Sequence, residues 1–251
     1  MQSLCPLTLL LCAVCCIMPF ASPAAEALSS DPLQDAAQLF NSGKRQEAFT
    51  LVDKVIKENP KSVQPVLFQG MLLLRSQDPA KAVESFTKAI ALDPKAATAY
   101  QSRGEANFFL GRFKESVSDF DQALAIEPEK KPYHWQRGIS CYYAQQFEEG
   151  RKQFEEHKTV NPNDVENAVW HYLCVARISG VEKARSALIP MEGDSRVPMK
   201  EIYALYSGKA SPEDVLRAAS AGTPSPARLK DHLFYAHLYL GLYYEAQADE
   251  K

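Results

Sequence analysis

The chain has 251 residues, which is enough for one large domain or two modest ones. Hydrophobic residues make up 46% of it, charged residues make up 24%, and the formal net charge is -3. This near-neutral balance excludes the strongly basic field of a general nucleic-acid binder, and the hydrophobic content excludes a mainly disordered chain.

Residues 1–27 are predicted to be a signal peptide or hydrophobic leader. Residues 4–21 form an uncharged apolar run of 18 residues, and a small-residue A-x-A pattern, Ala25-Glu26-Ala27, follows it. This order is typical of a secretory segment with its cleavage site, so we expect a mature start near Leu28. The predicted location is the periplasm, cell envelope or secretory pathway, with an organelle lumen as the alternative.

Two alternatives to cleavage stay open, because no Lys or Arg precedes Lys44 and a signal peptide usually begins with a basic segment. The first is a membrane anchor, against which two prolines and the short length argue. The second is lipidation, although Cys12, Cys15 and Cys16 lie inside the apolar run rather than after it. We expect membrane contact only if the leader is retained or lipidated.

Helix-breaking and small residues then recur every 34 residues. The prolines of this pattern are Pro60, Pro94, Pro128 and Pro162, and the glycines are Gly70, Gly104 and Gly138. A phenylalanine stands eight residues before each of the last three prolines, at Phe86, Phe120 and Phe154. Proline ends a helix, whereas glycine lets two helices cross closely, so each period predicts a helical hairpin. The phenylalanines are predicted to fill the seam between neighbouring hairpins.

The pattern resembles the tetratricopeptide repeat family, with four units over residues 28–162. This resemblance implies an all-α fold, a right-handed α-solenoid of helical hairpins whose concave side is lined by the first helix, helix A, of each unit. Only Cys141 and Cys174 follow the leader, and we expect both to be small buried hydrophobic residues rather than a disulfide or reactive thiols.

Residues 163–251 are predicted to be degenerate helical repeats. Helices are expected up to Ala176, over 181–191, over 196–206, from Ser211 onward and over 227–246. Gly241 falls where a further unit would place its helix-A glycine, so the last hairpin is predicted to be incomplete. That would leave an uncovered apolar face, with the aggregation or docking liability of such a patch, at Leu238, Tyr239, Leu242 and Tyr243.

Motifs of catalysis are absent: the sequence has no G-x-S-x-G elbow, no phosphate loop and no H-E-x-x-H. The five histidines show no ligand spacing. We therefore predict no enzyme activity, no cofactor and no metal.

The resemblance implies a peptide-binding groove lined by helix-A positions. Transferred to this chain, these positions hold Leu67, Met71, Gln101, Glu105, Phe108, Trp135, Ile139 and Tyr142. The surface is apolar and aromatic, so it lacks the Lys/Asn clamp with which one subgroup of the family captures acidic chaperone tails. Either these aromatic residues anchor a bound peptide, or the C-terminal helices fold back and make them internal packing.

A wider resemblance, from about Leu33 to Glu245, is to bacterial envelope tetratricopeptide lipoproteins of the NlpI type. Residues 134–139 and 234–241 carry it. It implies a scaffold for peptidoglycan hydrolases that often dimerises.

Together these features predict a non-catalytic, exported interaction scaffold that binds a protein or peptide, binds no nucleic acid and can form a homodimer. The alternatives are a structural homo-oligomer whose own chain fills the groove, and an enzyme with its site in residues 163–251.

Overall fold

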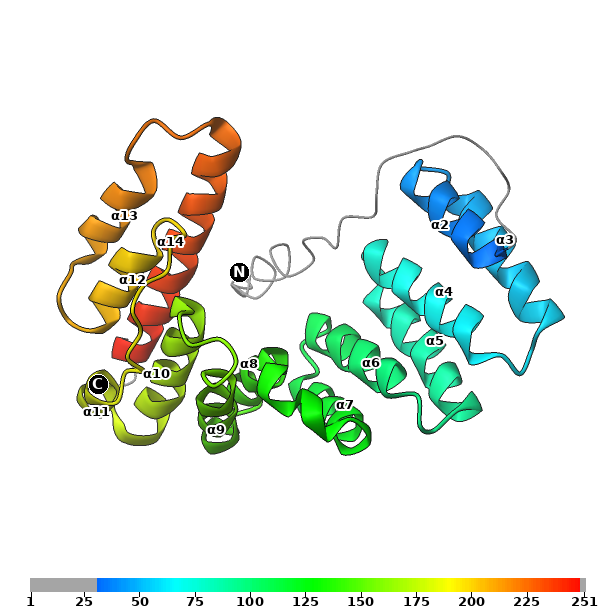
Figure 1. The fold of residues 1–251 in the computed structure, drawn as a ribbon, viewed down its shortest axis with the longest axis horizontal. Coiled ribbons are helices and arrows are strands. Elements are labelled where there is room, and N and C mark those ends of the chain that lie inside the picture. The colour runs from blue at the N-terminus through cyan, green and yellow to red at the C-terminus, as the bar shows by residue number, and fades with distance from the viewer. Residues whose placement is uncertain (1–30, 249–251) are drawn as a thin grey trace. The chain divides into compact units, whose positions relative to one another are not determined.

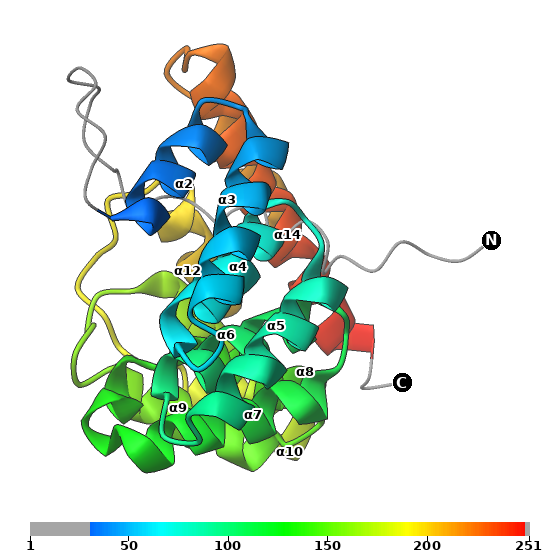
Figure 2. The same cartoon turned by 90° about the vertical axis from the view of Figure 1, so that its right-hand side faces the viewer.

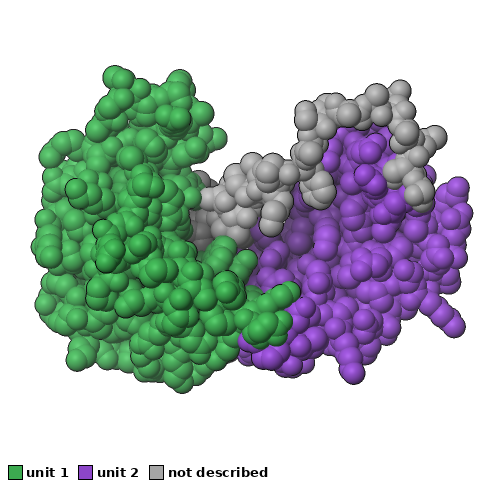
Figure 3. Space-filling view, viewed as in Figure 1, with its two compact units in different colours: residues 1–16, 129–251 green, residues 17–128 purple. Residues whose placement is uncertain are grey.

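The computed structural model describes residues 31–248, and among these every regular element is a helix. This confirms the predicted all-α solenoid of hairpins. Two compact units divide the described chain, residues 31–128 and residues 129–248 (Figure 3). The predicted leader, residues 1–27, lies outside the described residues.

Residues 31–128 form three antiparallel hairpins, in which a helix A is followed by a helix B (Figure 1). The A helices are α2 (Pro32–Asn41), α4 (Val63–Arg75) and α6 (Ala97–Phe109). The B helices are α3 (Arg45–Glu58), α5 (Pro79–Leu92) and α7 (Phe113–Ile126). In Figure 2 the three A helices follow one another from top to bottom of the view.

The helix ends of this unit follow local sequence. Asp31 and Asp78 cap α2 and α5 by accepting from the backbone N–H groups of Leu33 and Lys81. The three B helices end two residues before Pro60, Pro94 and Pro128, as the proline spacing predicts. Each A–B turn contains a residue with positive φ at the same place in the period, namely Gly43, Gln77 and Gly111.

The periodic glycines are where helix A and helix B of one hairpin approach each other. A Cβ atom added to Gly70 would lie 2.4 Å from the ring of Phe86, and one added to Gly104 would lie 2.7 Å from the ring of Phe120. The predicted close crossing is therefore confirmed. Each ring first covers the glycine of its own hairpin, and Phe86 also shares a hydrophobic cluster with Ala99 of the next hairpin.

A polar side chain stands immediately before each of these glycines and joins three consecutive helices. Gln69 donates to Asp53 of the preceding B helix over 2.7 Å and accepts from Ser85 of the following one over 3.0 Å. Arg103 donates to Thr87 over 3.1 Å and, through Nη2, to Asp119 over 2.6 Å. These bonds keep neighbouring hairpins in register, because each links the B helices on either side of an A helix.

Residues 129–248 contain one 3₁₀ helix and seven α-helices, with less regular hairpins. Their bounds are η1 (Pro128–Tyr133), α8 (Trp135–Tyr143), α9 (Phe147–His157), α10 (Val165–Ser179), α11 (Val181–Ser186), α12 (Met199–Tyr206), α13 (Pro212–Ser220) and α14 (Pro226–Ala248). Within residues 31–248, no helix has the length and apolarity that crossing a membrane requires.

The unit boundary at 128/129 differs from the sequence boundary at 162/163, because the fourth repeat departs from its predecessors. The 34-residue period places the start of its helix A at residue 131, but α8 begins at Trp135. Pro132, which has no N–H, lies in the 3₁₀ segment that replaces the first turn. At the other end of this repeat, α9 stops at His157, well before Pro162, and the Thr159 hydroxyl bonds to the Glu156 carbonyl.

The C-terminal helices match the predicted segments with one clear difference. Gly180, with φ of 84°, ends α10, and Ser211 and Asp214 form a capping box at the start of α13. The helix expected over residues 181–191 is shorter than predicted, since α11 ends at Ser186.

Candidate functional site

In residues 31–128, the A helices present equivalent positions side by side. Nη2 of Arg75 in α4 donates to Oδ1 of Asn41 in α2 over 2.8 Å, and these residues are one 34-residue period apart. Helix α4 contacts both α2 and α6. We call the surface made by Asn41, Met71, Arg75, Glu105 and Phe109 the ladder face, because its members stand at the same or adjacent turns of successive A helices.

The predicted groove residues of this unit divide into accessible and buried ones. Met71 is 37% exposed, and Gln101, Glu105 and Phe108 are half-buried. Leu67 is only 5% exposed and packs in the cluster around Phe86, so the prediction that it lines an open groove is wrong. The Leu67 side chain belongs to the same hydrophobic cluster as Phe86 on helix B of its own hairpin, so it is part of the core.

One end of the ladder face carries a positive charge. The Arg75 guanidinium lies 4.8 Å above the centre of the Phe40 ring while it donates to Asn41. Stacking and hydrogen bonding both hold it against α2. The sequence prediction missed Arg75, although its place one period after Asn41 could have pointed to it.

The middle of the ladder face carries a negative charge. Nε2 of Gln101 donates to Oε1 of Glu105 over 2.9 Å, one helical turn apart on α6. Burial raises the pKa of Glu105, and the hydrogen bond from Gln101 offsets this only in part. Across the described part of the chain, no Lys, Arg or His forms an ion pair with Glu105.

In residues 129–248 the predicted groove residues are mostly core. Ile139 is 5% exposed and Tyr142 is 3% exposed, whereas Trp135 is half-buried. The Tyr142 ring packs edge-on against Trp170, with ring centres 5.5 Å apart, and its hydroxyl donates to Glu245 of α14 over 3.0 Å. The prediction that Ile139 and Tyr142 line an open groove is therefore wrong. The alternative, that C-terminal helices fold back onto them, holds here.

Helix α14, which accepts the Tyr142 hydroxyl through Glu245, is itself packed within residues 129–248. Its Tyr239 is fully buried and donates its hydroxyl to Glu166 of α10 over 2.7 Å, while the Tyr239 carbonyl accepts from Tyr206 of α12 over 2.9 Å. Leu242 is also buried. The expectation of an uncovered apolar face is therefore wrong for Tyr239 and Leu242, because α10, α12 and α13 pack against α14, whereas Leu238 and Tyr243 are half-buried. Gly241 differs from the earlier glycines, since a Cβ there would meet nothing within 4 Å.

An arginine and three carboxylates tie α10 to the segment before α12. Arg196 donates through Nε to Asp194 over 3.0 Å, through Nη2 to Asp164 over 2.7 Å and through Nη1 to Glu166. Burial by itself would raise the pKa of Asp194, but the hydrogen bonds from Arg196 outweigh it and lower that pKa. The sequence prediction missed this cluster, because its members are spread over more than 30 residues with no motif.

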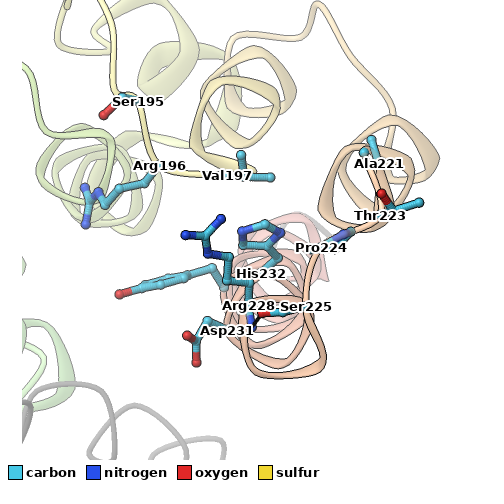
Figure 4. A pocket seen from close by; sticks show the side chains of 12 residues that line it. Ser195, Arg196, Val197, Ala221, Thr223, Pro224, Ser225, Arg228, Asp231 and His232 are labelled. Carbon is cyan, nitrogen blue, oxygen red and sulfur yellow. Dashed lines mark hydrogen bonds between the residues drawn. The ribbon is translucent and has the colours of Figure 1, made fainter.

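A pocket of about 500 Å³ lies beside this cluster, between residues 195–197, residues 221–225 and the first turns of α14. Figure 4 shows that Arg196 points away from Thr223 and Pro224 on the opposite wall. Nδ1 of His232 lies 3.1 Å from the Ala219 carbonyl. Because Arg196 and His232 already have partners, this pocket is a weaker candidate than the ladder face.

Neither metal nor thiol chemistry is favoured by the described residues. In residues 31–248, no group of three or more His, Cys, Asp or Glu side chains is arranged to hold a metal ion. Cys141 and Cys174 are fully buried thiols, and burial raises the pKa of the Cys174 thiol far above its usual range. Both therefore behave as the small core residues that the sequence predicts.

Known structures with the same fold come from repeat proteins. A tetratricopeptide repeat protein from Parabacteroides merdae is 15% identical, with a TM-score of 0.59 over 86% of this chain and 91% of its own. The MamA protein is 17% identical, with a TM-score of 0.58 over 78% of this chain and 96% of its own. YrrB, described as a TPR protein with an unusual peptide-binding site, is 21% identical, with a TM-score of 0.51 over 76% of this chain and 96% of its own.

The sequence itself matches the family model "Tetratricopeptide repeat" over residues 66–96 and 97–130. These segments contain α5, α6 and α7 and most of α4, where the glycine–phenylalanine packing is most regular. Proteins of this family are generally non-catalytic scaffolds. The wider resemblance to NlpI-type lipoproteins stays a prediction. Residues 66–130 therefore match tetratricopeptide repeats, and the described chain shares the helical solenoid fold of known repeat proteins.

Proposed function

We propose that this protein is an interaction scaffold whose ladder face binds an extended peptide segment of a partner protein. The repeat fold supports a protein-interaction role, and the finer assignment depends on one observation. Met71, an apolar side chain 37% exposed, stands one turn before Arg75 on α4 and one 34-residue period before Glu105 on α6, and α4 contacts both α2 and α6. An apolar centre with polar groups at fixed places is what a peptide needs for affinity and register.

The peptide-binding site named for YrrB supports the same role for this fold. Residues 129–248 are proposed as structural support instead, because the hydroxyl groups of Tyr142, Tyr206 and Tyr239 all donate to other residues of this unit. An interface of this kind would bind at about micromolar strength, near -8 kcal/mol.

A matched pair of substitutions tests the proposal. Short random peptides are selected on the full chain, and the Kd of selected peptides is measured by fluorescence anisotropy. Met71→Gln is expected to weaken binding about tenfold, which corresponds to about 1.4 kcal/mol. Leu92→Gln, a change at a side chain 38% exposed on helix B, is the control and should leave the Kd unchanged. Equal Kd values for both variants would contradict the assignment.

We also propose export, supported by the apolar leader-like run in residues 4–21. N-terminal sequencing of the mature protein is expected to start near Leu28. A start at Met1 would contradict cleavage, and a modified cysteine at the start would favour lipidation. Light scattering on the purified chain decides between a monomer and the homodimer that the NlpI-type resemblance implies.

A further inference from the structure

Glu105 is an uncompensated charge in the middle of the ladder face. Its neighbours at equivalent positions are Met71 and, one turn away on α6, Phe109 and Gln101. Asp119, the buried acidic side chain of the described repeat core, is paired in contrast: it accepts from Arg103 and Asn107. Glu105 accepts one hydrogen bond, from a neutral amide, and no Lys, Arg or His within residues 31–248 forms an ion pair with it.

The positive charge of the ladder face, on Arg75, already has interaction partners on α2. Arg75 is held against α2 by the Phe40 ring at 4.8 Å and by Asn41 at 2.8 Å. It therefore does not neutralise Glu105, although both belong to the ladder face. The face carries one satisfied cation at the end of α4 and one unsatisfied anion in the middle of α6.

A half-buried carboxylate of this kind has already lost much of its hydration during folding. A cation that arrives with a ligand therefore gains a charge-assisted hydrogen bond without a second large desolvation of the carboxylate. A ligand carboxylate at the same place would be repelled, which discriminates against acidic peptides. The apolar Met71 beside it favours a peptide that alternates basic and apolar contacts rather than a purely charged one.

We infer that the peptide bound on the ladder face carries a lysine or arginine side chain that donates to Glu105, next to an apolar side chain that packs on Met71. This inference rests on the proposed peptide-binding function and adds the chemical class of the partner segment. The residue types on the ladder face thus select a basic-apolar segment, in contrast to an acidic tail.

The experiment uses the full chain and synthetic random peptides in which one central position is fixed as Lys, Gln or Glu. With the natural chain, the Lys pool should bind about tenfold more tightly than the Gln pool, as one charge-assisted hydrogen bond provides, and the Glu pool most weakly. Glu105→Gln should remove the preference for Lys, and Glu105→Lys should invert it toward Glu. The control Glu84→Gln changes the net charge equally at an exposed site of α5 and should preserve the preference.

The outcomes separate this inference from the proposal on which it rests. If Met71→Gln weakens binding but the Lys, Gln and Glu pools bind alike, the ladder face is a peptide site and the basic class is wrong. If Met71→Gln changes nothing, the site itself is wrong. Circular dichroism melting of Glu105→Gln and Glu105→Lys shows that each variant is folded, so a lost preference reports recognition.

Discussion

The two units of this protein are built from the same kind of helical hairpin, but they differ in whether the helix-A side is accessible. In residues 31–128 the A helices keep an accessible surface that includes Met71 and Glu105. In residues 129–248 the position equivalent to both, Ile139, is buried, and so is Tyr142, which stands one period after Phe108 and bonds to α14 of the same chain. The repeat period therefore specifies how the hairpins pack, whereas the segments that follow a hairpin in the chain decide whether its helix-A side stays accessible.

The largest expected effect on this comparison comes from removing the ion pairs that tie α10 to the segment before α12. Arg196→Met leaves Asp194, Asp164 and Glu166 without their cation, so residues 129–248 should lose about 3 kcal/mol, the low end for a broken buried ion pair because Arg196 is partly exposed. Hydrogen exchange should quicken in α10 and α14 and stay unchanged in α4 to α6. Arg217→Met, which removes one exposed pair with Asp214, is the control and should cost less than about 1 kcal/mol.

A pair of glycine substitutions compares the packing of the two units. Gly104→Ala should destabilise residues 31–128 by about 2 kcal/mol, because the new Cβ would lie 2.7 Å from the Phe120 ring, which is buried and has little room to move. Gly241→Ala should instead stabilise α14 by about 0.5–1 kcal/mol, because nothing lies within 4 Å of its Cβ and alanine favours the helix. Thermal melting checks both; equal shifts would show that Gly241 is also covered by a packed helix.

Removing one hydroxyl group tests how much the hydrogen bond between Tyr142 and Glu245 stabilises residues 129–248. Tyr142→Phe keeps the ring packed on Trp170 but loses the bond to Glu245, so the unit should lose about 1 kcal/mol. Hydrogen exchange is expected to increase at the end of α14. Tyr244→Phe, at a ring 55% exposed on the same helix, serves as the control and should change neither quantity. Unchanged exchange in Tyr142→Phe would mean that ring packing alone holds α14.

The smallest expected effect is the pH dependence of the stability of residues 31–128. Burial raises the pKa of Glu105 above its ordinary 4.5, so the unfolded chain loses this proton first as the pH rises. The stability of residues 31–128 therefore falls as the pH rises from 4.5 through the folded-state pKa, and the loss persists above it. Glu105→Gln removes that loss and should be more stable than the natural chain at pH 7, with the difference vanishing below pH 4.5. Urea unfolding across this range checks the prediction, and a constant difference would contradict it.

Local patterns predicted the hairpins well and the site only in part. Pro60, Pro94 and Pro128 ended their helices as expected, and Ser211 capped α13, because proline and capping residues act on the backbone beside them. Leu67 and Met71 shared a predicted role, but they stand one turn apart on α4 and only Met71 is exposed. Helical spacing alone does not resolve a difference that depends on which side chains of α5 and α6 reach each position.

The amino-acid sequence by itself determined the repeated hairpin and its close crossing at Gly70, Gly104 and Gly138, since a missing side chain and a phenylalanine at fixed spacing leave one way to pack two neighbouring helices. Only the tertiary structure decided that Tyr142 is buried and that Glu105 forms no ion pair with a described residue. Those outcomes depend on contacts between residues far apart in the chain, such as Tyr142 with Glu245 and Tyr239 with Glu166. Such contacts produce no repeating pattern in the amino-acid sequence, because each is made once, between segments that only folding brings together.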